Sequence, residues 1–179
     1  SNIETSSGSG TITIGQSGET VNIPSGTTVS GAGANTPGFS AYLGSDQSGI
    51  SDATWTKINM NTEFFDSDGK YDTSNYRFTP TIAGKYMFGA SLYLDATDTM
   101  VTTEIGFYKN GSKLLYASTN VEDTAREAIL TGVIDLDSDD YVELYAYVNV
   151  ASGGTWSVNQ DGTTSNNRAF WYGYKIIGA

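Results

Sequence analysis

The residue types that most often do chemistry in enzymes are missing from this chain. It has no His and no Cys among its 179 residues, so neither a Ser-His-Asp set nor a Cys-His pair can form. The same absence removes the commonest ligands of transition metals. The sequence also lacks the GxxxxGK[ST] phosphate loop, and no GxGxxG motif follows an expected strand. We therefore expect no catalytic residues.

Carboxylates are the remaining candidates for catalysis. Two acids can together hydrolyse a glycosidic bond, and Asp135, Asp137, Asp139 and Asp140 lie close in the sequence. Residues 136–140 have the composition of a polar hairpin between two strands, which is the favoured interpretation. A carbohydrate-active enzyme is therefore only a weak alternative.

Oxygen ligands could also bind Ca²⁺. The candidates are Asp95 with Asp98, Glu122 with Asp123, and the acids of 135–140. An EF-hand loop over the last group would need Gly at Asp140 and Glu at Ala146, so that spacing fails. Solvated acidic loops are the favoured interpretation. We expect no cofactor, with the metal site unknown and Ca²⁺ left open.

One tryptophan lies in a polar stretch that suits ligand binding. Residues 152–167 (SGGTWSVNQDGTTSNN) form the longest late connection between expected strands. An exposed Trp156 beside the amides of Asn159 and Gln160 could stack on a neutral sugar and hydrogen-bond it. The alternative, equally weighted, is that Trp156 packs at the edge of an oligomer.

The charge of the chain limits its partners. Twenty acidic residues face nine basic ones, a formal net charge of −11. Phosphate binding needs clustered Lys and Arg, so we expect no nucleic acid and no anionic membrane as ligand. No run approaches the ~18 apolar residues of a spanning helix. We therefore expect no membrane insertion.

The chain changes character near Pro37. Residues 1–37 contain no aromatic residue and no Lys or Arg. They have alternating apolar positions between Gly and Ser turns, typical of short strands: Ile12, Ile14, Val21 and Ile23. Such small strands gain a core when identical chains wrap together. We predict a stem or attachment segment over 1–37 and one domain over 38–179; a flexible linker is the alternative.

Strands dominate the second segment. We expect them over 38–44, 54–60, 84–94, 101–109, 113–118, 127–136, 140–150 and 168–177. Asn110-Gly111 suits a type I′ turn, and only 121–128 could form a helical turn. Many strands at regular spacing are typical of a sandwich or barrel.

The expected strand 140–150 has two different faces. One is aliphatic and suits a core: Val142, Leu144, Ala146, Val148 and Val150. The other carries Tyr141, Tyr145 and Tyr147. A solvated face is normally charged, and Tyr is enriched at interfaces. We expect these tyrosines, with the four apolar residues of the stem, to form an interface between subunits of an oligomer. Ordinary strand tyrosines are the alternative.

A spaced motif connects this domain to a known family. Asp66, Tyr71, Phe78, Gly84, Tyr86 and Phe88 have the spacing of the C1q-like globular head, so residues 38–179 resemble the complement C1q/tumour necrosis factor superfamily. Met60 and Ala90 depart from it, since the family usually has aromatic residues there. Segments 107–112, 136–142 and 170–177 are similar to the family too. The resemblance implies an all-β, ten-stranded jelly roll that assembles as a compact homotrimer.

The repeats of residues 1–37 resemble bacteriophage fibre and appendage proteins. Animal heads of the C1q family usually follow a collagen stalk of Gly-X-Y triplets, and this sequence has none. No secretory signal precedes Ser1. Virions assemble in the host cytoplasm, so a virion protein would need no secretory signal.

The two resemblances together imply a virion structural protein. It would be a trimeric fibre or appendage whose head contacts the host surface, a glycan for example, while residues 1–37 bind other virion proteins. A capsid decoration or head-fibre protein is the first alternative, favoured if 179 residues are the whole product. A secreted C1q-like binding module of a cell is the second.

Overall fold

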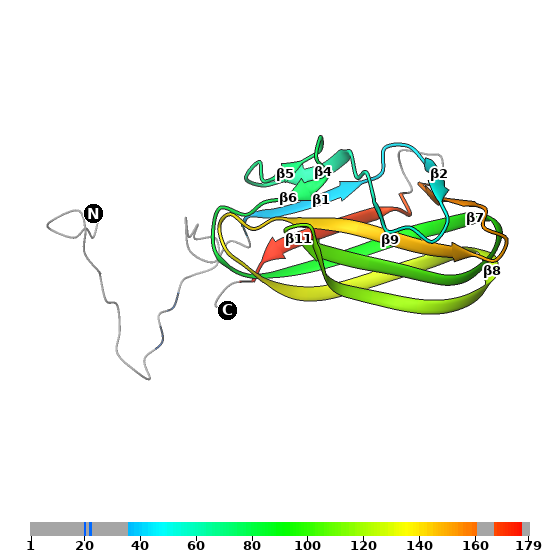
Figure 1. Ribbon diagram of the computed structural model, residues 1–179. Coiled ribbons are helices and arrows are strands. Elements are labelled where there is room, and N and C mark those ends of the chain that lie inside the picture. The colour runs from blue at the N-terminus through cyan, green and yellow to red at the C-terminus, as the bar shows by residue number, and fades with distance from the viewer. Residues whose placement is uncertain (1–19, 21, 23–35, 161–166, 177–179) are drawn as a thin grey trace, which may run out of the picture. The chain divides into compact units, whose positions relative to one another are not determined.

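The computed structural model describes residues 20, 22, 36–160 and 167–176 (Figure 1). The predicted stem residues Ile12, Ile14, Val21 and Ile23 lie outside them. The described residues contain no helix that is long and apolar enough to cross a membrane. They form eleven strands: β1 (Gly38–Tyr42), β2 (Gln47–Ser51), β3 (Thr56–Lys57), β4 (Thr62–Asp66), β5 (Tyr71–Asp72), β6 (Arg77–Phe78), β7 (Gly84–Lys109), β8 (Ser112–Leu136), β9 (Val142–Val150), β10 (Thr155–Asn159) and β11 (Phe170–Lys175).

Two long strands, β7 and β8, belong to both layers of the sandwich. The first half of β7 pairs with β11 and with the second half of β8, and β1 and β4 extend this first sheet beyond β11. The second half of β7 pairs with β9 and with the first half of β8, and β3 and β6 pair with β9 to extend the second sheet. Figure 1 shows β7 and β8 turning together at one end of the molecule. The pairing is irregular between Asp95 and Met100 of β7, where the chain leaves one sheet for the other.

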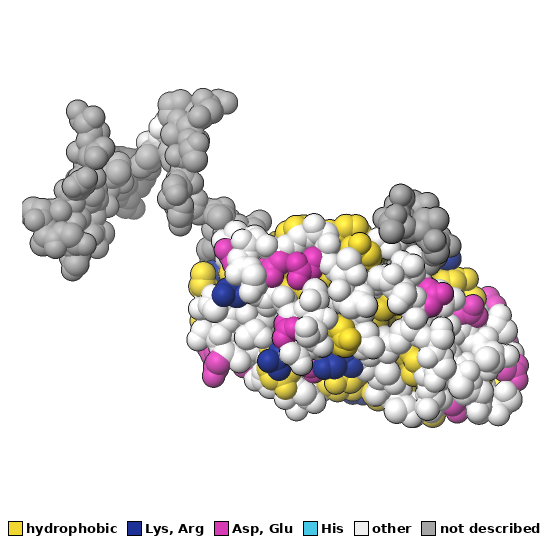
Figure 2. Space-filling model, turned by 90° about the horizontal axis from the view of Figure 1, so that it is seen from above, with side chains coloured by type: hydrophobic (Ala, Val, Ile, Leu, Met, Phe, Trp, Pro, Cys, Tyr) yellow, Lys and Arg dark blue, Asp and Glu magenta, His cyan; other side chains and the backbone are white. Residues whose placement is uncertain are grey.

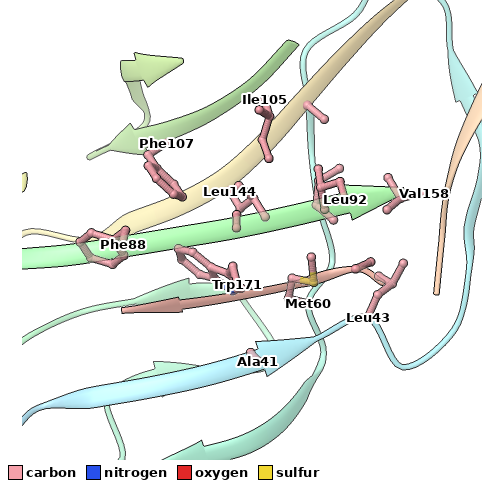
Figure 3. Close-up of a cluster of buried hydrophobic side chains, with 14 of the residues drawn as sticks. Ala41, Leu43, Met60, Phe88, Leu92, Ile105, Phe107, Leu144, Val158 and Trp171 are labelled. Atoms are coloured by element: carbon pink, nitrogen blue, oxygen red, sulfur yellow. The ribbon is translucent and has the colours of Figure 1, made fainter. Parts of the chain in front are cut away.

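The core lies between the two sheets and is built by period-two alternation. The aliphatic face predicted for 140–150 is buried along its whole length, as are alternate residues of β7. Trp171 of β11 packs against Phe88 and Phe107, with ring centroids 6.1 and 6.3 Å away (Figure 3). The predicted all-β sandwich is confirmed, with eleven strands described in place of ten.

The residues of the family motif build this core. Tyr71 is stacked on Phe39 with ring centroids 4.8 Å apart, and its hydroxyl donates to the Met60 carbonyl at 2.6 Å. Burial raises the pKa of this phenol. Asp66 accepts the backbone N–H of Tyr71 at 2.8 Å and so orders the turn before it. The motif thus specifies packing, and none of these contacts needs a ligand.

Two turns at one end of the second sheet are joined through side chains. Asn110 and Gly111 both have positive φ, 52° and 75°, which is the predicted type I′ turn between β7 and β8. Asn110 donates to Asp140 at 2.6 Å and accepts the backbone N–H of Tyr141 at 2.9 Å. Asp140 also accepts the Asp137 N–H at 2.7 Å and lies 2.6 Å from the Lys109 ammonium. The Asp140 carboxylate therefore stabilises these turns.

The strands expected over 84–94 and 101–109 are both present and are continuous in one element, β7. Two other local predictions were wrong. Residues 121–128 form no helical turn but lie in β8, because they pair with the irregular middle of β7. Residues 155–159, expected in a loop, form β10, because β2 and β7 both supply backbone partners there.

Candidate functional site

Trp156, the predicted sugar-stacking residue, lies in the core. It is only 1 % exposed in β10, and its indole N–H donates to the Ser51 carbonyl at 3.0 Å. Val158, two residues further along the strand, is also buried. Trp156 therefore has no free ring face for a sugar, and the prediction of an exposed stacking residue is wrong.

The two predicted amide ligands contact the protein itself. Asn159 donates from its side chain to Asp95 at 3.2 Å. The backbone N–H of Gln160 donates to Asp46 at 2.8 Å. Both side chains are half-buried. Asn159 and Gln160 follow Trp156 in the chain, but because the Trp156 ring is buried, no aromatic surface lies beside their amides.

The predicted interface tyrosines lie on the outward face of the second sheet, where they meet other aromatic residues. Tyr145 is stacked on Tyr108 with ring centroids 4.0 Å apart, and Tyr147 packs on Trp55 at 5.8 Å. Burial, helped by neighbouring negative groups, raises the pKa of both Tyr108 and Tyr145. Much of the apolar surface of these tyrosines is thus covered by their own chain.

Trp55 is the centre of this cluster, which we call the aromatic platform: Trp55, Tyr108, Tyr116, Tyr145 and Tyr147. The indole lies across the sheet above Gly106, where a Cβ atom would meet ring carbons at 3.2 and 3.3 Å. A side chain at this position would push the indole away by a few tenths of an ångström, so glycine favours this contact. The Lys113 ammonium lies 4.5 Å from the Trp55 ring centre and 4.4 Å from that of Tyr116.

Ionic contacts complete the same face beside the platform. Lys57 lies 2.8 Å from Glu143, whose side chain is only 8 % exposed. The guanidinium of Arg77 lies over the Tyr141 ring, 4.8 Å from its centre. The third predicted interface tyrosine therefore has a contact within its own chain as well.

The outward face of the first sheet is different, because its apolar side chains are uncovered. Ile129 is 64 % exposed and Val133 is 51 % exposed. Tyr174, Met87 and Val133 form one row across three strands by register. Two further exposed aromatic side chains, Phe64 and Phe65, lie on β4 at the other margin of the sheet. We call these residues the apolar face.

The edge formed by β8 is also incompletely covered. Among the described strands it pairs only with β7, so its two halves are the outer strands of both sheets. Val121, Ile134 and Leu136 of this strand are buried, but four apolar residues packed against the core are only partly buried: Leu115, Ala117, Ala128 and Leu130. A hollow of about 710 Å³ opens at the turning point, lined by Met100, Val121 and their neighbours. Figure 2 shows another side of the molecule, where hydrophobic, acidic and basic side chains are interspersed.

The candidate calcium ligands are not brought together. No three acidic side chains in the described part of the chain lie close enough to hold a metal ion. Asp140 is engaged by Lys109, whose hydrogen bond, with those of Asp137 and Asn110, lowers the carboxyl pKa. Asp98 accepts the Thr99 backbone N–H at 2.7 Å. The described geometry gives no metal centre.

Sequence reasoning missed the platform and the apolar face. Trp55 falls inside the expected strand 54–60. Alternation within that strand does not show that the Trp55 ring lies over Gly106 of a different strand. Ile129 and Val133 are apolar and four residues apart, and a count of alternate positions would have placed them on one face of their strand. That signal was available.

Comparison with known proteins connects part of the chain to a phage-like element. No protein-family model matches the chain. The phage-like element PBSX protein XkdV of Bacillus subtilis (strain 168) is 34 % identical over 108 residues, which is 55 % of this chain. The chain covers only 16 % of the length of that curated relative.

Solved structures share the fold. The tumour necrosis factor Eiger of S. frugiperda has a TM-score of 0.56 at 11 % identity, over 79 % of this chain and 92 % of that one. Murine APRIL has a TM-score of 0.52 at 13 % identity, over 78 % and 98 %. The globular domain of zebrafish complement 1qA has a TM-score of 0.49 at 14 % identity, over 79 % and 98 %. The first two likenesses confirm the predicted jelly roll of the tumour necrosis factor/C1q type.

Proposed function

We propose that this chain is a structural protein of a phage-type particle, a trimeric fibre or appendage whose jelly-roll head contacts the host surface without catalysis. The observation that carries the proposal is the sequence similarity to the phage-like element protein XkdV. The head has the fold of binding proteins such as Eiger, which supports a role in contact rather than in chemistry.

Two uncovered surfaces support assembly into a trimer. The apolar face includes Ile129 and Val133 on the outward side of β8, and the β8 edge leaves apolar residues of the core-facing side partly uncovered. When one such surface packs against the other on the next copy, the contact is head-to-tail, and it forms a ring where the rotation between copies closes. Burial of exposed residues such as Ile129 and Val133 would stabilise that ring by about 25 cal/mol per Å² of apolar area. The family resemblance supports three copies in the ring.

The tyrosines predicted for the interface have a different place in this proposal. Tyr145 and Tyr147 are half-buried on Tyr108 and Trp55 of their own chain, so they offer less free apolar area than the first sheet. We therefore place the head contacts on the apolar face and leave the aromatic platform outside them. The contribution of Ile12, Ile14, Val21 and Ile23 in the stem, with attachment to the virion through 1–37, stays a prediction.

Immunogold electron microscopy of particles from producing cells tests the proposal. Antibodies raised against residues 38–179 should label fibres or appendages, with the label displaced from their base. Label over the capsid shell would favour the decoration or head-fibre alternative. Unlabelled particles, with the protein found free in the medium, would contradict a virion role and favour the secreted binding module.

A further inference from the structure

Trp55 differs from the other two tryptophans of the chain in a way that indicates a ligand. Trp156 and Trp171 are at most 1 % exposed, and their indole N–H groups donate to Ser51 and to Tyr71. Trp55 is only partly buried, and among the described residues its N–H has no hydrogen-bond acceptor. A large aromatic ring with a free donor at the surface is typical of a recognition residue.

We propose that the aromatic platform binds a neutral saccharide, a pyranose chain stacked on Trp55 and Tyr116. This inference rests on the proposed function and names the class of surface molecule that the head would contact. The apolar C–H faces of a pyranose pack on flat rings, and its hydroxyl groups need nearby donors and acceptors.

The platform has both kinds of group at its margins. Lys113, which has no ion-pair partner within the described residues, lies over the Trp55 and Tyr116 rings. A contact of this kind is weak at an exposed site, so the flexible side chain can swing aside and donate to sugar hydroxyls. Glu104 lies on the same face, 3.1 Å from the Ser118 hydroxyl, and can accept hydrogen bonds from them.

Charge favours a neutral saccharide over an acidic one. The Lys113 ammonium and the Glu104 carboxylate lie beside the rings. Two other lysines of this sheet are already in ion pairs, Lys57 with Glu143 and Lys109 with Asp140. The charges beside the rings therefore balance. The whole chain has a net charge of −11, which repels a polyanion at long range. A neutral chain of hexoses needs no excess of positive charge beside the rings and is not repelled by the net negative charge of the protein.

The backbone around the platform favours a saccharide over a peptide. Peptides that bind sheets usually add a strand to an open edge or fill a deep groove. The Trp55 ring lies over Gly106 of β7, which is paired on both sides with β8 and β9, while Tyr116 lies on the outer strand β8. At Trp55 the backbone groups are already paired, so only side chains are free to contact a ligand, and this suits stacking.

An array of immobilised tetrasaccharides of glucose, galactose, mannose and galacturonic acid tests the proposal with the full chain. At least one neutral tetrasaccharide should bind the wild type, and Tyr116→Ala should weaken that binding by about tenfold or more. Leu114→Ala is the matched control, since Leu114 is an exposed neighbour, 48 % exposed, that the β7–β8 register leaves unpaired. It should bind as the wild type does.

Tryptophan fluorescence gives a second readout. Since Trp156 and Trp171 are buried, the spectral change on titration with the bound tetrasaccharide should come from Trp55 and vanish in Trp55→Phe. Binding of galacturonic acid alone, no binding at all, or equal binding by Tyr116→Ala and wild type would overturn the proposal. Immunogold label on appendages combined with any of these results would leave the virion role standing and remove only the saccharide.

Discussion

The outward faces of the two sheets differ in which residues they carry and in how far those residues are covered by the chain itself. On the second sheet, Trp55 crosses over Gly106 and packs on Tyr147 of β9 and Tyr108 of β7, so the chain itself covers part of this face. On the first sheet, Ile129 and Val133 are more than half exposed, and no described residue covers them. A Tyr-rich strand face therefore does not by itself identify a subunit contact. Uncovered aliphatic area on a sheet is the stronger indication.

The largest effect that we expect on the second sheet comes from filling the space under Trp55. Gly106→Val should lower the free energy of unfolding by about 2 kcal/mol, because its side chain collides with the indole and with the Leu115 carbonyl. Urea denaturation at a fixed protein concentration measures the change. A variant as stable as the wild type would show that Trp55 is not seated on Gly106.

The turn beside the platform provides the next largest effect. Asp140→Asn should cost about 2 kcal/mol, since Lys109, Asn110 and the Asp137 N–H all contact the carboxylate. The folded-state pKa of Asp140 is lowered by these contacts. Its contribution is therefore complete above the ordinary Asp pKa of about 3.9 and is lost as pH falls below that value. The stability difference between variant and wild type should shrink below about pH 4; a constant difference would exclude the ionised carboxylate as its source.

A smaller loss of stability is expected when a side chain that packs on Trp55 is removed. Tyr147→Ala should lower the free energy of unfolding by about 1 kcal/mol through the lost ring contact, while the assembly keeps its molar mass. Thermal unfolding followed by circular dichroism, with light scattering on the same sample, separates the two effects. If the assembly dissociates, Tyr147 lies in the subunit interface, as the sequence predicts.

The smallest effect should come from an ion pair on the first sheet. Lys85 lies 3.4 Å from Asp135, and the two side chains are 50 % and 75 % exposed. Lys85→Gln should change the free energy of unfolding by less than about 0.5 kcal/mol. Lys57→Gln is the informative contrast, because it leaves the carboxylate of Glu143, 8 % exposed, without its ammonium. Equal losses would mean that the two faces are equally solvated.

The sequence predicted the fold class because that class depends on alternation and on a spaced motif, but it did not predict the short strands β2, β4, β5 and β6. Tyr71, Phe78, Tyr86 and Phe88 are all buried in one cluster, and the Asn110-Gly111 turn has the expected positive φ angles. These features are local, or are carried by packing residues whose types are restricted. The strand β10 was missed although Trp156 and Val158 alternate, because the polar composition around them suggested a loop.

The candidate sites were less predictable because they depend on contacts between distant segments. The place of Trp55 is set by a glycine about fifty residues away, and composition gives no sign of that pairing. Trp156 was expected at the surface for its amide neighbours, yet β2 and β7 enclose it. Whether an aromatic residue is covered or free depends on such tertiary partners.

The molar mass of a first-sheet variant tests the account most directly. Light scattering on the wild type should give about 57 kDa, three times the chain mass of 19.1 kDa. The double variant Ile129→Asp with Val133→Asp should stay folded and give the mass of a single chain, since both side chains are exposed in the subunit and charges there would be buried only in the assembly. A double variant that remains at about 57 kDa, or a wild type that is itself monomeric, would contradict assembly through the apolar face.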